Sequence, residues 1–167
     1  ELFAFFDFTA LASASVGQVH RAQLKDGTPV VVKVQHAGIE KKVQGDLNLL
    51  TSLAALAESN SREIEHYRPS ATVAEFRRSL LRELDFGTEL NNLLVFTQNF
   101  AENPNVHVPT PYPDYSSRRV LTMEMLQGYS IKYVDRMRAE GIDPAAFATR
   151  FSGAMLDMIF KFGFYHA

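Results

Sequence analysis

Two strand-like runs joined by an Asp-Gly turn constrain the fold of this chain more than any other feature. The stretch from residue 12 to residue 35 reads ASASVGQVHRAQLKDGTPVVVKVQ. Asp-Gly between two such runs predicts a β-hairpin with a type I′ turn at Asp26 and Gly27, because both central positions of that turn need a positive φ. Two antiparallel strands therefore meet here, and a loop of small residues precedes the first of them.

A single lysine, Lys33, interrupts the valine run of the second strand. Side chains alternate along a strand, so Lys33 lies on the face opposite Val32, and a lysine in such a run is seldom buried without a partner. A loop beside a lysine is the arrangement with which kinases hold the phosphates of a nucleotide. The hairpin by itself favours an ordinary antiparallel pair whose lysine extends into water.

A longer pattern favours the kinase interpretation. The residues AxASxGQVHxAxLxDGxxVxVKVQxxGI resemble the signature of the UbiB family of atypical protein-kinase-like proteins, also called ADCK or ubiquinone-biosynthesis kinases. Further motifs of that family follow in the same order. The resemblance implies an α+β fold: a protein-kinase-like N-lobe, built as an antiparallel sheet with inserted helices, plus the first helices of the C-lobe. It places the N-lobe and hinge in residues 1–128 and the truncated beginning of the helical C-lobe in residues 129–167.

Composition excludes several other classes. The chain has 167 residues, is 46% hydrophobic and carries a net charge of −2, so it can bury a core but offers no basic surface for nucleic acid. It has no cysteine, which excludes disulfides and cysteine metal sites and suits a reducing compartment. No apolar run reaches the roughly 18 residues of a membrane span. No targeting signal is visible, but the chain begins at Glu1 rather than at methionine, so we expect a fragment whose upstream signals would not be seen.

Helical spacing of apolar residues predicts two helices after the hairpin. The first covers residues 39–57, and a polar connection follows over residues 58–69. The second begins at Thr72, a candidate N-cap with Glu75 three residues later as a capping box, and continues to about Phe100.

The middle of the second helix, ELDFGTELNN, contains the acidic residues of a family motif. The resemblance implies that Glu89 is the ion-pair partner of Lys33, and that Glu83 and Asp85 contact a segment lying N-terminal of this chain. Spacing alone favours a solvated acidic helix face. Asp46 lies closer to Lys33 in sequence and is the runner-up partner.

The small-residue loop has alanine and serine where ordinary kinases have glycine. A Cβ atom restricts positive φ, so this loop should be stiffer than a glycine-rich one and its backbone less able to wrap phosphates. The resemblance implies that its backbone nevertheless covers the phosphates while Lys33 binds the α and β phosphates. The loop residues assigned to nucleotide binding are Ala12, Ser13, Ala14, Ser15, Gly17 and Gln18.

A second strand-like run, residues 118–126, follows a proline-rich loop and is broken by Gln127-Gly128. The resemblance makes it the last N-lobe strand and the hinge, with Glu124, Met125 and Leu126 at the adenine side, acting through their main chain. The alternative is a plain core strand with an exposed glutamate. The loop histidine, His107, has no second ligand at metal-binding spacing, so we predict no metal site in this chain.

The last predicted helix starts at Asp143-Pro144, a residue pair typical of an N-cap and first turn. An apolar stripe follows over residues 147–162, which we interpret as core packing, and Gly163 ends the helix. His166 and Ala167 match the first two letters of the family's catalytic loop, HADPHPGN. The catalytic loop, the DFG motif and the Mg²⁺ ligands are therefore expected beyond residue 167.

The resemblance implies a nucleotide-binding parent protein that uses ATP and Mg²⁺ as an atypical kinase or ATPase. It also implies a role in ubiquinone or other isoprenoid-lipid metabolism, with an isoprenoid lipid or membrane surface as partner. The expected location is the cytoplasmic side of a membrane, or a mitochondrion or plastid. This chain alone should not transfer phosphate. The alternatives are a pseudokinase or lipid-linked scaffold without phosphotransfer, and a small-molecule phosphotransferase.

Overall fold

The computed structural model describes residues 2–60 and 62–165, which form two compact units. The first unit comprises the chain up to residue 92 together with residues 110–125, and the second comprises residues 93–109 together with the chain from residue 126 onward. The predicted division of the chain at residue 128 stays a prediction. None of the helices described is long and apolar enough to cross a membrane.

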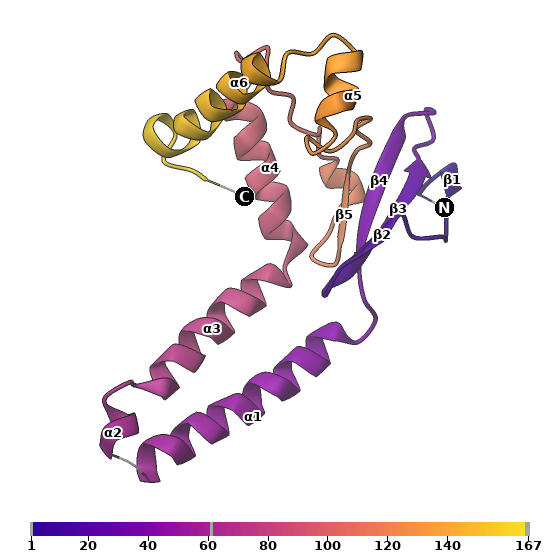
Figure 1. The fold of residues 1–167 in the computed structure, drawn as a ribbon. Coiled ribbons are helices and arrows are strands. Elements are labelled where there is room, and N and C mark those ends of the chain that lie inside the picture. Colours follow the sequence, from indigo (N-terminus) through magenta and orange to yellow (C-terminus); the bar gives the residue numbers. More distant parts are fainter. Residues whose placement is uncertain (1, 61, 166–167) are drawn as a thin grey trace. The chain divides into compact units, whose positions relative to one another are not determined.

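The first unit contains one antiparallel sheet of five strands (Figure 1). The strands are β1 (Phe5–Phe6), β2 (Ala12–Ser13), β3 (Gly17–Gln23), β4 (Pro29–Gln35) and β5 (Val120–Glu124). Their order is β1-β3-β4-β5, with β2 also pairing with β3. The sheet confirms the predicted α+β class, and it places β4, which carries Lys33, between β3 and β5.

The predicted hairpin is confirmed, but its predicted type I′ turn is wrong. Of the two turn residues only Gly27 has a positive φ, of 90°. The Gly27 N–H donates to Leu24 O at 3.0 Å and the Leu24 N–H donates to Thr28 O at 2.9 Å, which is the pattern of a turn followed by a glycine bulge. Asp26 avoids the left-handed region and instead accepts the Thr28 N–H at 2.9 Å. That hydrogen bond lowers the pKa of the Asp26 carboxyl.

The core of the sheet lies on one face of the β3–β4 pair. Its buried members are Ala22, Leu24, Val30 and Val32, and each of these is at most 5% exposed. Phe3 and Phe6, from around the edge strand β1, pack against this cluster. The alternating valines of β4 therefore point into the core, and the face that carries Lys33 is left for contacts with the helices.

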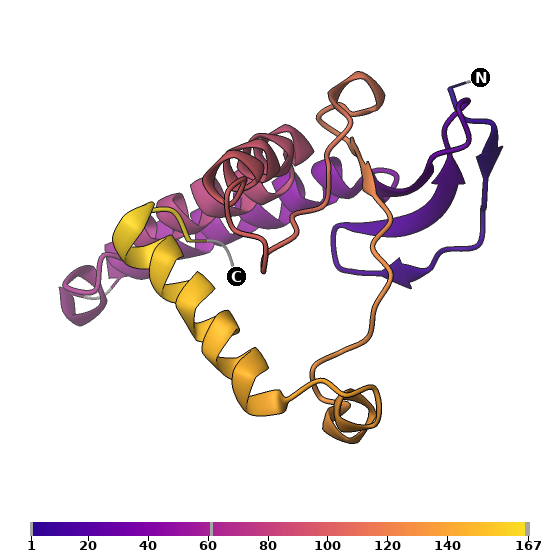
Figure 2. The same cartoon turned by 90° about the horizontal axis from the view of Figure 1, so that it is seen from above.

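Two long helices of the first unit lie side by side in both views (Figures 1 and 2). They are α1 (Ile39–Asn60) and α3 (Pro69–Glu83), connected through the short α2 (Arg62–Glu65). The predicted helix over residues 39–57 is confirmed by α1. The predicted N-cap at Thr72 is wrong, because α3 begins three residues earlier with Pro69 in its first turn and Arg68 as N-cap.

The predicted single helix from Thr72 to Phe100 is also wrong, because the chain breaks between α3 and α4 (Phe86–Asn99). The break lies at Leu84 and Asp85. The Phe86 N–H leaves the helical pattern and donates to Arg118 O, in the segment entering β5, at 3.0 Å. Asp85 Oδ1 accepts the Gly87 N–H at 2.9 Å and so satisfies one of the unpaired donors of the new helix. A tertiary hydrogen bond thus replaces a helical one.

The second unit contains α5 (Val134–Ala139), α6 (Pro144–Leu156) and a π-helical turn, η2 (Asp157–Lys161). Asp143 caps α6 as predicted, since its carboxylate accepts the N–H groups of Ala145 and Ala146 at 3.0 and 3.3 Å. The Phe162 N–H donates five residues back to Asp157 O, so the last turn is wider than an α-helical one.

The apolar stripe of α6 is less buried than predicted. Phe151 and Ile159 are 51% and 50% exposed, whereas Ala154 is buried. Aromatic contacts instead occur at the end of the stripe, where Phe100 and Phe162 have ring centroids 5.2 Å apart. The expectation of core packing along the whole stripe is therefore wrong for Phe151 and Ile159.

Candidate functional site

Lys33 and Glu89 form the central ion pair of the first unit. Lys33 Nζ lies 2.7 Å from Glu89 Oε2, and the two side chains are 23% and 30% exposed. The residues are 56 positions apart in sequence, and β4 and α4 bring them together. The contact implied by the family pattern forms, and Glu89 rather than Asp46 holds the ammonium. Their assignment as catalytic residues stays a prediction.

Phe86 completes the surroundings of the ammonium and was missed by sequence reasoning. Lys33 Nζ lies 4.7 Å from the centroid of the Phe86 ring, and Phe86 is only 1% exposed. Phe86 and Glu89 both belong to the first turn of α4, so a single helix turn supplies an aromatic face and a carboxylate to the same cation. An ammonium carries three donors, so this pairing leaves it able to bind an anionic ligand such as a phosphate.

The alanine-rich loop forms the turn between β2 and β3. The Ala14 N–H donates to Gly17 O at 2.8 Å, which leaves Ser15 and Val16 at the tip. A Cβ atom at Gly17 would lie 2.5 Å from Val34 O, so only glycine allows β3 to approach β4 this closely. The predicted phosphate loop is therefore built on the same hairpin as Lys33.

His36 fixes this loop and was also missed by the sequence analysis. The Nε2 atom of its ring lies 2.9 Å from Ala14 O and 3.5 Å from Ser13 Oγ. The main-chain N–H of His36 donates to Val16 O at 3.0 Å. The turn is thus held by the residue that follows β4. No local signal in the sequence marks this contact, because it joins residues more than twenty positions apart.

The family's acidic pair lies at the break between α3 and α4. Glu83 is the last residue of α3 and is exposed. Asp85 caps α4, and its Oδ2 lies 3.9 Å from Nε of Arg118. The same guanidinium donates to Glu40 Oε1 at 3.0 Å. Asp85 therefore has partners within this chain, and the implied contact of the pair with an N-terminal segment stays a prediction.

The predicted adenine side lies at the end of β5. The Glu124 N–H donates to Thr110 O at 2.8 Å, and Glu124 pairs with Val30 of β4 on the other side. Met125 and Leu126 follow the last strand residue. Within the predicted set, Met125 and Leu126 are thus the ones whose main chain lies outside the sheet ladder, and their role stays a prediction.

A cluster of side chains that could hold a metal ion does not occur in the part of the chain that the structure describes. No group of three or more histidine, aspartate or glutamate residues placed to hold a metal ion occurs among residues 2–60 and 62–165. The two residues matched to the start of the catalytic loop, His166 and Ala167, lie outside the described residues.

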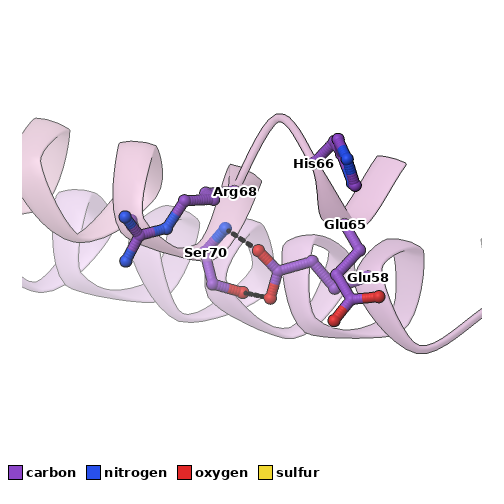
Figure 3. Close-up of a pocket in the computed structure, with 6 residues that line it drawn as sticks. Glu58, Glu65, His66, Arg68 and Ser70 are labelled. Atoms are coloured by element: carbon purple, nitrogen blue, oxygen red, sulfur yellow. Dashed lines mark hydrogen bonds between the residues drawn. The ribbon is translucent and has the colours of Figure 1, made fainter. Parts of the chain in front are cut away.

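A cavity of about 640 Å³ lies elsewhere, at the tip where α1, α2 and α3 meet (Figure 3). Its lining includes Glu58, Glu65, His66, Arg68 and Ser70. The Glu58 carboxylate accepts the Ser70 N–H at 2.9 Å and the Ser70 hydroxyl at 2.6 Å, and these hydrogen bonds lower the pKa of Glu58. The carboxylate thus satisfies the first turn of α3. None of the motif residues lines this cavity, so we do not assign the nucleotide site to it.

Comparison with known proteins identifies the family and the fold of the chain. The family model described as the ABC1 atypical kinase-like domain matches residues 1–167. The chain belongs to this family. Its kinase-like fold is also shared with a solved structure titled as the complex of Rv3197 and erythromycin from Mycobacterium tuberculosis. That structure matches with a TM-score of 0.68 and 28% sequence identity, over 81% of this chain and 34% of the other.

Curated relatives carry the name "Probable protein kinase UbiB". The protein from Cellvibrio japonicus is 35% identical over 167 residues, which is 100% of this chain and 30% of the relative. The protein from Xylella fastidiosa is 36% identical over 165 residues, which is 99% of this chain and 30% of the relative. The chain is thus similar to these UbiB proteins along its whole length and spans less than a third of the length of these relatives.

Proposed function

We propose that this protein in its full length binds ATP with Mg²⁺ at Lys33 and acts as an atypical kinase or ATPase. The observation that carries the proposal is the Lys33–Glu89 ion pair at 2.7 Å, on the hairpin that also carries the alanine-rich loop. A lysine fixed by a distant glutamate beside a phosphate loop is the arrangement that kinases need before they transfer a phosphoryl group. Membership of a kinase-like family supports the same conclusion.

Each residue of the site has a distinct task in this proposal. Lys33 binds the α and β phosphates, and Glu89 orients the ammonium. The turn of residues 12–18 covers the phosphates, and the main chain of Met125 and Leu126 contacts the adenine edge. ATP supplies the phosphoryl group, and Mg²⁺ neutralises its charge through ligands beyond residue 167. The donor capacity of the partly exposed Lys33 ammonium fits an anionic phosphate.

The proposed biological role is support of ubiquinone or other isoprenoid-lipid metabolism, at the cytoplasmic side of a membrane or within an organelle. The name of the curated relatives supports this role. A pseudokinase or lipid-linked scaffold is the second candidate. It is favoured by the loop, because Ala12, Ser13 and Ala14 replace glycines and His36 holds the turn by both side chain and main chain.

The test is magnesium-dependent ATP binding and turnover by the full-length protein and its Lys33→Met variant. We expect Lys33→Met to lower ATP turnover by about a hundredfold or more, because an aligned cation at the phosphates is removed. Lys25→Met is the matched control, since Lys25 is an exposed lysine of the same hairpin turn and should leave turnover unchanged. Equal turnover in wild type and Lys33→Met would overturn the proposal. ATP binding without turnover would favour the pseudokinase.

A further inference from the structure

Gln35 is a buried polar residue at the end of β4, and the predicted site gives it no task. It is 7% exposed and lies two residues after Lys33, on the same face of the strand. Its Nε2 atom donates to Leu84 O and lies 3.4 Å from Arg118 O. These two carbonyls come from the break between α3 and α4 and from the segment entering β5. One amide therefore joins three segments of the first unit.

The hydrogen bond from Gln35 pairs a carbonyl, Leu84 O, that the helix break leaves without its helical donor. In an unbroken helix the Thr88 N–H would donate to Leu84 O, but here it donates to Asp85 O at 3.0 Å. Leu84 is only 2% exposed, so its carbonyl would lack a donor in a buried place, which is costly. The Gln35 amide supplies that donor.

Two residues on the same face of β4, Gln35 and Lys33, thus contact the chain at the start of α4. Gln35 holds the break at Leu84, and Lys33 holds the first turn through Glu89. The Phe86 N–H donates to Arg118 O, the second carbonyl near the Gln35 amide. Two contacts on one strand face fix both the position and the rotation of the first turn of α4.

We propose that Gln35 is a positioning residue that sets the Glu89 carboxylate against the Lys33 ammonium by holding the α3–α4 break on β4. It acts through Glu89 and does not itself touch the nucleotide. Its consequence for ATP binding rests on the proposed function, whereas its effect on the ion pair does not. Without this contact the first turn of α4 is free to shift, and a shift of about 1 Å is enough to cost a site roughly a hundredfold in rate.

The first experiment measures the Lys33–Glu89 interaction without any nucleotide. Urea denaturation of the full-length protein gives the free energy of unfolding of Lys33→Met, of Glu89→Gln and of the double variant. The set is measured once with Gln35 present and once with Gln35→Met. We expect the effects of Lys33→Met and Glu89→Gln on the free energy of unfolding to be non-additive with Gln35 present and additive with Gln35→Met. Gln23→Met is the matched control, because Gln23 also donates its amide to a backbone carbonyl, Gly27 O at 2.8 Å, elsewhere in the sheet.

Gln35→Asn is a second variant in case Gln35→Met does not fold, since asparagine keeps an amide but is one methylene shorter. It should also make the effects of Lys33→Met and Glu89→Gln on the free energy of unfolding additive. An undiminished interaction in either folded variant overturns the inference. If neither variant folds, Gln35 serves the core as a whole and the inference is likewise overturned.

The second experiment measures Mg²⁺-ATP affinity. We expect Gln35→Met to weaken binding by between about ten- and a hundredfold in the wild type, and to add little once Glu89→Gln is present. Additive effects would overturn the positioning role, because a residue that acts through Glu89 cannot add to its loss. If the wild type binds no ATP, the proposed function fails, and the unfolding experiment still decides the role of Gln35.

Discussion

Glu58 and Glu89 are both glutamates of the first unit that accept hydrogen bonds, but Glu58 accepts them from a neutral serine and Glu89 from a charged lysine. Glu58, at the tip of the α1–α3 pair, binds the main chain and hydroxyl of Ser70, only 12 residues away. Glu89, beside the sheet, binds an ammonium 56 residues away over the buried ring of Phe86. A cavity of about 640 Å³ lies at Glu58, whereas the ion pair with Lys33 lies at Glu89. The proposed function rests on that ion pair and not on a cavity.

The largest expected difference between the two regions concerns stability. Phe86 is 1% exposed beneath Lys33, whereas Tyr67 near the tip is 81% exposed. Phe86→Ala should lower the free energy of unfolding by about 3–5 kcal/mol, because it leaves a cavity in a packed region. Tyr67→Ala should change it by at most about 0.5 kcal/mol. Urea denaturation followed by circular dichroism measures both. Equal losses would show that the two regions are packed alike.

A smaller difference concerns the response to salt. The Lys33–Glu89 pair is only partly exposed, so a double-mutant cycle should give an interaction of roughly 1 kcal/mol in the free energy of unfolding. That value should fall in 1 M NaCl, because salt screens charges that solvent can reach. The corresponding cycle of Glu58→Gln and Ser70→Ala should depend less on salt, since serine is neutral. A salt-independent value at Lys33 would contradict the exposure seen here.

The smallest expected effect is the pH dependence at the tip. Hydrogen bonds from Ser70 lower the pKa of Glu58 in the folded chain below its ordinary value of 4.5. Its contribution to stability is therefore complete above pH 4.5 and is lost as the pH falls through the lower, folded pKa. The stability difference between wild type and Glu58→Gln, followed by urea denaturation from pH 6 to pH 3, should shrink toward the acid end.

A variant of the hydrogen-bond donor provides the control for that measurement. Ser70→Ala removes the hydroxyl that donates to Glu58 Oε2 at 2.6 Å. In the Ser70→Ala background, the stability difference caused by Glu58→Gln should depend less on pH. A difference between wild type and Glu58→Gln that stays constant down to pH 3 would show that the Ser70 hydrogen bonds do not favour the ionised carboxylate.

Local features were predicted well because their causes are local. The Asp-Gly hairpin, α1 and the Asp143 cap of α6 each depend on residues within a few positions of one another. The turn type was mistaken because Asp26 had a second option, a hydrogen bond to the Thr28 N–H, that avoids a positive φ. The break at Leu84 and Asp85 could not be seen in the helical pattern, since the hydrogen bonds that replace the helical ones come from Arg118 and Gln35.

The sequence by itself determined the β3–β4 hairpin, the strand β5 and the family motifs, because alternation and turn chemistry are set by neighbouring residues. Only the tertiary structure decided how α4 starts, which aromatic ring lies beneath the ammonium and which residues hold the alanine-rich turn. Those contacts join Lys33 with Phe86, Gln35 with Leu84, and His36 with Ala14. Each forms between side chains or carbonyls that are distant in sequence, so their geometry exists only once the sheet and the helices have packed together.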